Sequence, residues 1–578
     1  MGIAVVMAIP WLLIDGGATG STSPLFKHFV SIIAYCYAVL FLPPIFAGNR
    51  TASVISLAGG LAVALVLTAD LTTLRYFDAP FLELYPYLPV TANNATLGAL
   101  GAYAASYVPP SIWLIAVVTT GVALAGSRFV RHRSQARTVT IGLLAGSLLL
   151  TFLPAGAFDR VDPRIAALMD EPAKPLQHLG AADRSGSFVM TGKPRAEPET
   201  IIVVIMESTG AATPASNGRG LLSRSIVADS GTGGWVNFPN AVTNSNATDV
   251  SVPSILTGSG AHESLAKIQH LPFLSQYASA RGYRTAFLTS STMRWAGFEA
   301  FFGEAHTDQM LTAQESGLPF VNDLGVDDHF VYRAAAQTIA QADGKLFMTL
   351  YPQSLHWPFQ TDSAFKIPDE IHDRRARATY IAEAGFRLLF DSLRKSGRLD
   401  DSLIVVTGDH GEFDYTSTLR MPRMRLNTFD EGILSPIFLV KAPGGMAAGD
   451  LGTLSANSAR LVANIDLAPT LADMLGGKLA KGLAYDGHSL FEPIPMNRIA
   501  YSTSTNEWRH WTRTAIAVSR GNQRMTCDET RLCRLHTARN AHLSPGRAAK
   551  PSDDLFRIAA SNPVMRQALG QIYRDYYD

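Results

Sequence analysis

Charge is distributed very unevenly along this chain, and that distribution limits its possible folds more than any other feature. From Met1 to about Gly156 charged residues are sparse and apolar runs follow one another, whereas the remainder has the mixed composition of a globular enzyme. Only 17% of all residues are charged, against about 25% in an average soluble protein. The sequence therefore predicts two parts: a helical transmembrane domain over residues 1–157 and a water-soluble domain over residues 200–578.

Four apolar runs in the first part have the composition and nearly the length of membrane-spanning helices, which need about 17–25 residues. These runs are Phe29–Ala47, Ser53–Leu71, Ile112–Gly126 and Val139–Ala155. A fifth run, Ile3–Ile14, is shorter, and no basic residue precedes it, which makes it a poor signal peptide. We therefore expect about five spans, and the sequence leaves open whether Met1 is the true start of the first.

Arginines indicate which side of the membrane the links between these spans face. Arg50 lies between the second and third spans, and four more arginines lie between the last two, at positions 128, 131, 133 and 137. Cytoplasmic links carry an excess of Lys and Arg. We therefore expect a multi-pass protein of the cell inner (cytoplasmic) membrane, with everything after the last span on the periplasmic face. Residues 158–199 are polar and contain prolines, which is typical of a linker with room for one interfacial helix.

The soluble part alternates between strand-like and helix-like patterns. Continuous apolar runs predict buried strands at 201–206, 284–290, 346–351, 402–407 and 436–442. Between two of them, residues 374–395 carry apolar side chains at helical spacing. This alternation predicts an α/β domain with a mostly parallel sheet and helices on both faces. The formal net charge of the chain is only +1, so there is no basic field for nucleic acid.

Chemically active residues follow two of the predicted strands directly. Glu207 follows one strand, and Asp409 and His410 follow another after a glycine. In open α/β sheets, ligands gather at the carboxyl ends of strands. Taken singly, Glu207 is also explained as a helix cap and His410 as a turn residue. Together, two carboxylates and an imidazole suit a zinc or manganese ion.

A hydroxyl group for nucleophilic attack is available in the stretch Asn240–Gly258. Pro253 is compatible with a helix start, and the N–H groups at a helix N-terminus attract phosphate. A hydroxyl held by a metal ion there loses its proton more easily and attacks phosphorus. The candidates are Thr248 and Ser251; the alternative is an ordinary Ser/Thr-rich loop with a helix cap.

Six motifs in this order resemble the alkaline phosphatase/sulfatase superfamily. They are VIMES (204–208), NATDVSVPSILTG (246–258), LHWPF (355–359), TGDHGE (407–412), FDEGILSPIFLVKAPG (429–444) and IDLAPTLADMLGG (465–477). Within that superfamily, the predicted anchor followed by an outward domain resembles the lipid A phosphoethanolamine transferases and the lipoteichoic acid synthases. The resemblance implies an alkaline phosphatase/sulfatase-like fold for the soluble domain.

The same resemblance implies roles for individual residues. Glu207, Asp409 and His410 match the metal ligands, and Thr248 matches the nucleophile that completes the metal site and is transiently phosphorylated. His356 matches a histidine that contacts the substrate phosphate or a second metal ion; the alternative is a loop histidine packed on its neighbour.

Two further residues take weaker roles from the resemblance. Glu412 matches an acidic residue beside the site, and Trp295 matches a substrate-facing aromatic, for which plain core packing is the alternative. The phosphoethanolamine transferases also carry a second histidine shortly after the Asp-His pair. This chain has none between His410 and Pro436, which leaves the number of metal ions open.

The resemblance implies a reaction: transfer of a phospholipid head group, phosphoethanolamine or phosphoglycerol, through a phospho-threonine. The expected partners are a phospholipid donor in the bilayer and a glycan, lipid A or polymer acceptor, and the expected enzyme is a membrane-embedded monomer that binds Zn²⁺, or alternatively Mn²⁺. One alternative is an anchored phosphodiesterase or sulfatase-like hydrolase, although Ile255 stands where sulfatases need arginine. Another is an inactive scaffold subunit. The sequence leaves open whether Cys527 and Cys533 pair.

Overall fold

The computed structural model describes most of the soluble part of the chain. The described residues are 179–578 except 295–297, 304–306, 323, 357–358, 363–364, 413–428, 505, 508–514, 528–532, 540–541, 544–545 and 573–578. The expected membrane spans, the N-terminal half of the expected linker and Trp295 lie outside the described residues. Within the described ranges, no helix combines the length and apolar character needed to cross a bilayer.

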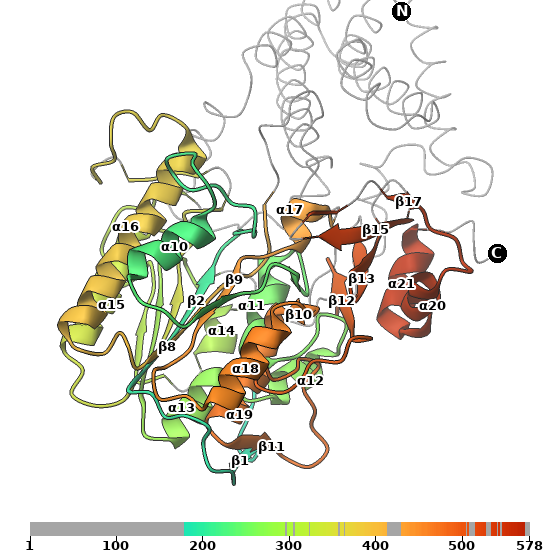
Figure 1. Ribbon diagram of the computed structural model, residues 1–578, viewed down its shortest axis with the longest axis horizontal. Helices are drawn as coiled ribbons and strands as arrows, with labels where there is room; N and C mark the ends of the chain where they lie inside the picture. Colours follow the sequence, from blue (N-terminus) through green and yellow to red (C-terminus); the bar gives the residue numbers. More distant parts are fainter. Residues whose placement is uncertain are drawn as a thin grey trace, which may run out of the picture. The chain divides into compact units, whose positions relative to one another are not determined.

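A seven-stranded sheet forms the centre of the described part (Figure 1). Its strands, in spatial order, are β3 (Trp235–Asn237), β9 (Phe438–Lys441), β8 (Ser402–Gly408), β2 (Thr200–Met206), β7 (Leu346–Tyr351), β5 (Arg284–Thr289) and β6 (Gln309–Leu311). Every residue of β2, β7 and β8 is buried, as expected for strands that are covered on both faces.

The sheet is mixed, because one strand, β9, runs antiparallel to both of its neighbours. The five strands from β8 to β6 run parallel to one another, whereas β9 runs antiparallel to both β8 and β3. The short helix α17 (Glu431–Leu434) precedes β9 at the carboxyl edge of β8, where Gly411 N–H donates to Ile433 O and Ile437 N–H donates to Thr209 O. A strand that starts where its neighbour ends must run in the opposite direction.

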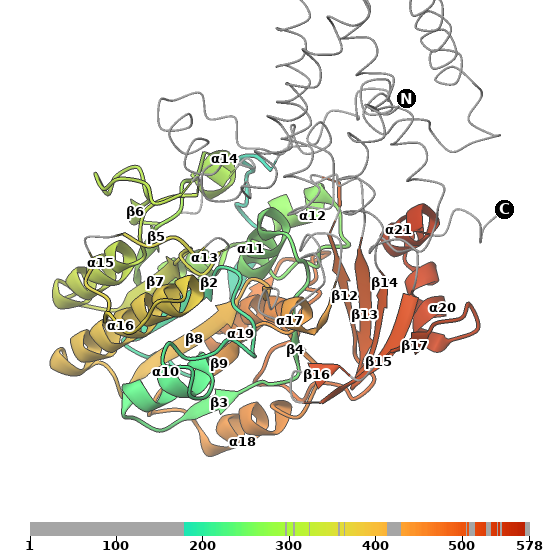
Figure 2. The same cartoon turned by 90° about the horizontal axis from the view of Figure 1, so that it is seen from above.

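Helices cover both faces of this sheet (Figures 1 and 2). One face packs against α10 (Leu222–Ser230), α15 (His329–Ala340) and α16 (Arg374–Lys395). The other side carries α11 (Thr248–Thr257), α12 (Leu265–His270), α13 (Leu274–Ala280), α14 (Phe298–Phe302), α18 (Ala448–Asn457) and α19 (Leu467–Met474). The α/β architecture predicted from the sequence is therefore confirmed, with a mixed sheet.

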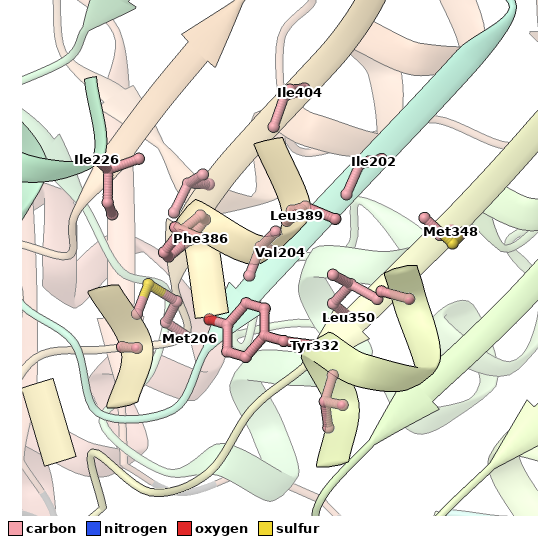
Figure 3. Packing of buried hydrophobic residues seen from close by; sticks show 14 of the residues in the cluster. Ile202, Val204, Met206, Ile226, Tyr332, Met348, Leu350, Phe386, Leu389 and Ile404 are labelled. Carbon is pink, nitrogen blue, oxygen red and sulfur yellow. The ribbon is translucent and has the colours of Figure 1, made fainter. Parts of the chain in front are cut away.

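The apolar stripe of α16 explains how this helix docks. Asp373 caps its first turn by accepting the Ala376 N–H at 2.8 Å. Phe386 and Leu389 project from α16 toward Ile202 and Val204 of β2, beside Tyr332 of α15 (Figure 3). These residues are less than 2% exposed. Their shared core fixes α15 and α16 against the strands whose carboxyl ends carry Glu207 and Asp409.

The segment that was expected to be a linker ends inside the folded part. Within residues 179–199, strand β1 (Phe188–Met190) pairs with β11 (Gly477–Leu479), which follows α19. The Arg195 side chain forms ion pairs with Asp450 and Asp473. Residues 179–199 therefore pack on the α/β fold.

The C-terminal part adds a second, antiparallel sheet with its own core. Its strands are β12 (Ile499–Thr503), β13 (Ile516–Arg520), β14 (Gln523–Cys527), β15 (Cys533–Arg539), β16 (His542–Leu543) and β17 (Arg547–Ala548), and helices α20 (Asp554–Ser561) and α21 (Pro563–Ile572) follow. Cys527 and Cys533, opposite each other on β14 and β15, form a disulfide. Thr503 N–H donates to Asn244 O at 3.1 Å. The last residue of β12 therefore contacts the segment that leads into α11, which connects the C-terminal sheet to the α/β fold.

Candidate metal centre

Two neighbouring parallel strands deliver the acidic residues to one edge of the central sheet. β2 and β8 are paired in a register that sets Met206 opposite Gly408. Glu207 and Asp409, the next residue on each strand, therefore leave the sheet at the same level. Both side chains are buried. The sequence predicted that these two distant stretches meet, because ligands gather at the carboxyl ends of the strands of an open α/β sheet. The structure brings the two stretches together at that edge.

Close backbone contacts require glycine around Asp409 and His410. A Cβ atom on Gly408 would lie 2.1 Å from the carbonyl oxygen of Thr209, and one on Gly411 would lie 1.6 Å from that of Gly432. Both distances are far inside van der Waals contact. The two glycines in the sequence TGDHGE thus allow the loops after β2 and β8 to pack against each other, which draws Glu207 toward His410.

Helix α11 supplies the hydroxyl group. Thr248 is its first residue, and its Oγ1 lies 3.1 Å from Glu207 Oε1 and 3.2 Å from His410 Nε2. The first N–H groups of a helix have no partner within the helix, and they favour a negatively charged ligand. Thr248 therefore stands at a helix start beside a carboxylate and an imidazole.

Ser251, the second hydroxyl candidate, has a different position. Its Oγ lies 2.6 Å from the backbone oxygen of Asp409 and 2.9 Å from Asn244 Oδ1, either of which can accept its hydrogen. The same Asp409 oxygen accepts the Thr243 hydroxyl and the amide of Asn464 at 2.9 Å. Ser251 is thus part of a buried polar network that holds the Asp409 backbone, whereas Thr248 points at the ligand atoms.

The four polar atoms are spaced as ligands of one metal ion are spaced. In addition to the two Thr248 distances, His410 Nε2 lies 3.1 Å from Asp409 Oδ2 and 3.7 Å from Glu207 Oε1. A tetrahedral ion with ligand bonds of about 2.0–2.1 Å separates its ligands by roughly 3.3–3.4 Å. Glu207, Asp409 and His410 form one of two groups of potential metal ligands among the described residues.

Hydrogen bonds around the ligands orient them for a cation. His410 Nδ1 lies 2.8 Å from the backbone oxygen of Gly411. A carbonyl oxygen can only accept, so Nδ1 donates to it; in the neutral ring the lone pair is then on Nε2, which faces Asp409 and Glu207. A lone pair directed at two buried carboxylates is repulsive unless a cation or a proton lies between them. A ligating histidine whose other nitrogen donates to a carbonyl is typical of protein metal sites.

The carboxylates are held by groups that the sequence analysis did not identify. Tyr351, the last residue of β7, donates its hydroxyl to Glu207 Oε2 at 2.6 Å. The N–H groups of Ser208 and His410 each donate to Asp409 Oδ1 at 2.8 Å. Ser208 adopts a φ of +53°, which a non-glycine residue rarely adopts. The edge rule could have identified Tyr351, because it ends a predicted strand next to Glu207.

The other predicted site residues lie nearby in the fold, or outside the described residues. Glu412 is buried in the loop after β8. His356 is partly exposed in the loop after β7, where its N–H donates to Gln353 O at 2.9 Å. It belongs to the same edge of the sheet as Glu207 because β7 is the parallel neighbour of β2. Trp295 lies outside the described residues.

Comparison with known proteins agrees with this architecture. The sulfatase family model matches residues 199–477. The chain is 24% identical over 277 residues to the uncharacterized sulfatase YdeN of Escherichia coli K12, which covers 42% of this chain and 47% of YdeN. The chain therefore matches about half the length of this curated relative.

Solved structures resemble this chain at low sequence identity. One is the integral membrane lipooligosaccharide phosphoethanolamine transferase A (EptA) of Neisseria meningitidis, with 14% identity and a TM-score of 0.47 over 82% of this chain and 93% of EptA. Another is the lipoteichoic acid synthase LtaP of Listeria monocytogenes, with 14% identity and a TM-score of 0.44 over 66% of this chain and 96% of LtaP. The match to the sulfatase family model, residues 199–477, contains all four residues of the site, Glu207, Thr248, Asp409 and His410.

Proposed function

We propose that this chain is a metal-dependent phosphotransferase that moves the head group of a phospholipid, phosphoethanolamine or phosphoglycerol, onto an acceptor in the cell envelope. The observation that carries the proposal is the position of Thr248. Its hydroxyl stands at the start of α11, 3.1 Å from Glu207 and 3.2 Å from His410. A hydroxyl beside metal ligands and helix N–H groups is suited to attack on phosphorus.

The residues present fit a divalent ion, which Glu207, Asp409, His410 and Thr248 would hold. Such an ion supplies positive charge that lowers the pKa of a hydroxyl and polarises a phosphoryl oxygen. Two carboxylate oxygens, an imidazole and a hydroxyl are compatible with zinc and with manganese. We favour zinc because four ligands with tetrahedral spacing are typical of that metal.

The reaction then has two displacements. In the first, Thr248 Oγ1 forms a bond to phosphorus, the bond between phosphorus and the glycerol oxygen breaks, and diacylglycerol leaves with a proton. In the second, an acceptor hydroxyl or phosphate oxygen attacks phosphorus, the bond to Thr248 breaks, and the threonine regains a proton. His356, at the same edge of the sheet, binds the phosphoryl oxygens or carries a proton in these steps.

Mass spectrometry of the covalent intermediate tests this proposal. The purified full chain is incubated with vesicles of phosphatidylethanolamine or phosphatidylglycerol and digested with trypsin, and the peptide between Arg224 and Lys267 is sequenced by fragmentation. We expect one phosphoethanolamine or phosphoglycerol unit on Thr248. Thr248→Ala should lose it and Ser251→Ala should retain it. An unmodified wild-type peptide together with no release of diacylglycerol would refute the transferase, and label on Ser251 would reassign the nucleophile.

Hydrolysis is the second candidate, and the sulfatase family match favours it. The two activities differ in the acceptor. A transferase releases diacylglycerol faster when an acceptor glycan or lipid A is added, whereas a hydrolase uses water and shows no such dependence. Sulfate esters serve as a further substrate for comparison. We expect weak activity on them, because the hydroxyl beside the ligands belongs to threonine.

An inactive scaffold is the third reading, and metal analysis separates it from both enzymes. The enzyme should purify with about one equivalent of zinc or manganese, and a chelator should remove both the metal and the activity. Because a phospholipid donor cannot leave the bilayer, the proposed reaction fits an enzyme that is anchored in the inner membrane as a monomer, with its catalytic domain on the periplasmic face.

A further inference from the structure

Asp327 and Asp328, two adjacent and almost fully buried carboxylates, lie where α15 begins. Asp328 is the N-cap residue of α15, but its side chain makes no capping bond to the helix. An Asp at this position ordinarily accepts an N–H from the first turn of its own helix. The Asp328 carboxylate is directed elsewhere, and its partners show where.

Asp328 joins two loops at the carboxyl edge of the sheet. Its Oδ1 accepts the Ser290 hydroxyl at 2.5 Å and the Gln353 N–H at 2.7 Å, and its Oδ2 accepts the Ser354 N–H at 2.9 Å. In return, Asp328 N–H donates to the Ser354 hydroxyl at 3.2 Å. Ser290 follows β5, and Gln353 and Ser354 follow β7. One buried carboxylate therefore fixes the backbone at the start of the loop that carries His356.

Asp327 holds the other end of the same loop. Its Oδ2 accepts the Asp362 N–H at 2.8 Å, and its Oδ1 accepts the backbone and ring N–H groups of His329 at 3.0 and 2.9 Å. His356 lies between the two attachment points, at residues 353–354 and at residue 362. Phe359, which is buried between them, adopts a φ of +61°, a backbone conformation that a non-glycine residue rarely adopts.

The start of the loop is also tied to the metal centre. Pro352 O accepts the Glu207 N–H at 3.1 Å, and the Tyr351 hydroxyl donates to Glu207 Oε2. Gln353 is fixed twice more: Nε2 donates to Val326 O at 2.9 Å, and Oε1 accepts from Asn322 at 3.1 Å. The loop is thus attached to Glu207 on one side and to the Asp327–Asp328 pair on the other.

We propose that Asp327 and Asp328 are positioning residues for catalysis, which act by holding the 353–362 loop so that His356 meets the phosphoryl group. This inference rests on the proposed function, in which His356 serves the phosphoryl transfer at Thr248. Neither aspartate has a role as a metal ligand. Their effect passes through backbone N–H groups to His356.

A double-mutant cycle between Asp328→Asn and His356→Gln tests this role. It is measured with the full chain on an aryl phosphodiester, whose cleavage requires the Thr248 centre but neither lipid nor acceptor. We expect Asp328→Asn alone to lower kcat by about tenfold to hundredfold, the cost of a misplaced catalytic group. In the His356→Gln background, the same substitution should change kcat by less than about twofold, because residues that act as one unit are not additive.

A merely structural role predicts a different pattern. Loss of folded protein lowers activity by the same factor in both backgrounds, and that outcome would overturn the proposal. The matched control is Asp308→Asn, at the amino edge of the sheet, where the Asp308 carboxylate accepts the N–H and hydroxyl of Thr285 at 2.8 and 3.0 Å. Any effect of this control should be equal in the two backgrounds.

Further experiments distinguish a failure of this proposal from a failure of the proposed function. If Asp328→Asn does not yield folded protein, the same cycle is run with Asp327→Asn, and equal effects in both backgrounds again overturn the proposal. A wild-type chain that cleaves the aryl ester but releases no diacylglycerol from vesicles refutes the lipid donor and leaves the positioning result standing. A wild-type chain that is inert to both substrates refutes the site and, with it, the positioning role.

Discussion

The hydroxyl of Tyr351 shows how one atom outside the ligand set can control the centre. It donates to Glu207 Oε2 at 2.6 Å in a fully buried environment. Hydrogen bonds to metal ligands fix their orientation, and their loss typically costs about tenfold to hundredfold in metal affinity. We therefore expect Tyr351→Phe to raise the dissociation constant for zinc by about that factor, measured by competition with a chromogenic chelator.

A second buried tyrosine provides the control for this measurement. Tyr283, at the start of β5, donates to Pro198 O, also at 2.6 Å. Tyr283→Phe removes an equivalent hydrogen bond far along the strand from the carboxyl edge, so it should lower stability by about 1 kcal/mol and leave zinc affinity unchanged. Equal zinc affinities in the two variants would show that Tyr351 does not orient Glu207.

Asp328 also gives the protein a stability that depends on pH. The pKa of Asp328 is raised from its ordinary 3.8 to about 6; burial is the main cause, the hydrogen bond from Ser290 opposes it, and the adjacent Asp327 carboxylate adds to it. Besides Asp327, the titratable group facing it is the Tyr332 hydroxyl of α15. Between these two pH values the native carboxyl keeps a proton that the unfolded chain has released, so stability falls as the pH rises.

The expected size of this loss is roughly 3 kcal/mol, from a shift of about two pKa units at 1.36 kcal/mol each. The measurement is the free energy of unfolding from about pH 4 to about pH 7, determined by pulse proteolysis for the wild type and for Asp328→Asn. The loss appears as a steeper decrease of this free energy with pH in the wild type than in the variant. The variant lacks the titrating group and should lack this part of the slope. Parallel curves would mean that the Asp328 pKa is not raised.

Among the secondary-structure elements, the contact between α15 and α16 depends on a glycine. A Cβ on Gly385 of α16 would lie 2.1 Å from the Tyr332 ring of α15. Alanine is favoured over glycine in a helix by about 1 kcal/mol, but overpacking costs about 1–3 kcal/mol. Because the buried ring between two helices has little room to move, overpacking should outweigh the helix preference, and we expect Gly385→Ala to lower the free energy of unfolding by up to about 2 kcal/mol.

Gly452 in α18 is the matched control, because a Cβ there would meet no atom within 4 Å. Gly452→Ala should gain the helix preference alone and raise stability by about 0.5–1 kcal/mol. Denaturation midpoints of the two variants should therefore move in opposite directions. Movement in the same direction would contradict the packing argument.

The elements that could be predicted from the sequence are those with a strong local signal. The continuous apolar run of β7 and the helical stripe of α16 gave the bounds Leu346–Tyr351 and Arg374–Lys395. The direction of β9 could not be read in this way, because a buried strand has the same apolar pattern in either direction. The C-terminal sheet was missed for a different reason: its strands are two to seven residues long and contain arginines and two histidines, which obscures any alternation.

The residues of the site differ in the same way: those with a strong local signal could be predicted from the sequence, and the others could not. Glu207, Asp409 and His410 were predicted because each closely follows a buried strand, and the structure places their ligand atoms together. Asn464, whose amide holds the Asp409 backbone, lies 55 residues away and directly follows β10 (Val462–Ala463), a strand of two residues that is too short to leave a pattern in the sequence. The two aspartates before α15 were likewise not identified from the sequence. Their contacts depend on how three loops meet, and no local pattern records that.

For the whole molecule, the predicted topology and the disulfide support the same location. Disulfides persist in oxidising compartments and are rare in the cytoplasm, and Cys527 and Cys533 pair within the core of the second sheet. Independently, the arginines at 128, 131, 133 and 137 predict that the last link between spans is cytoplasmic. Both arguments support the proposed location of the soluble domain on the periplasmic face. A bacterial alkaline phosphatase reporter fused after Asp578 should therefore be active, and a green fluorescent protein reporter should be dark.

Charge substitution tests the cause of this orientation. If the arginine-rich link determines the topology, changing its four arginines to glutamine should lower the activity of the phosphatase reporter and raise the fluorescence of the other, because positive charge in short links is what retains them in the cytoplasm. The matched control changes four arginines of the soluble domain, at positions 284, 333, 374 and 557, which lie far from the predicted spans and should leave both reporters unchanged. A wild-type fusion that fluoresces would place Thr248 on the cytoplasmic side, where an outer-leaflet phospholipid cannot reach it, and the proposed donor would have to be abandoned.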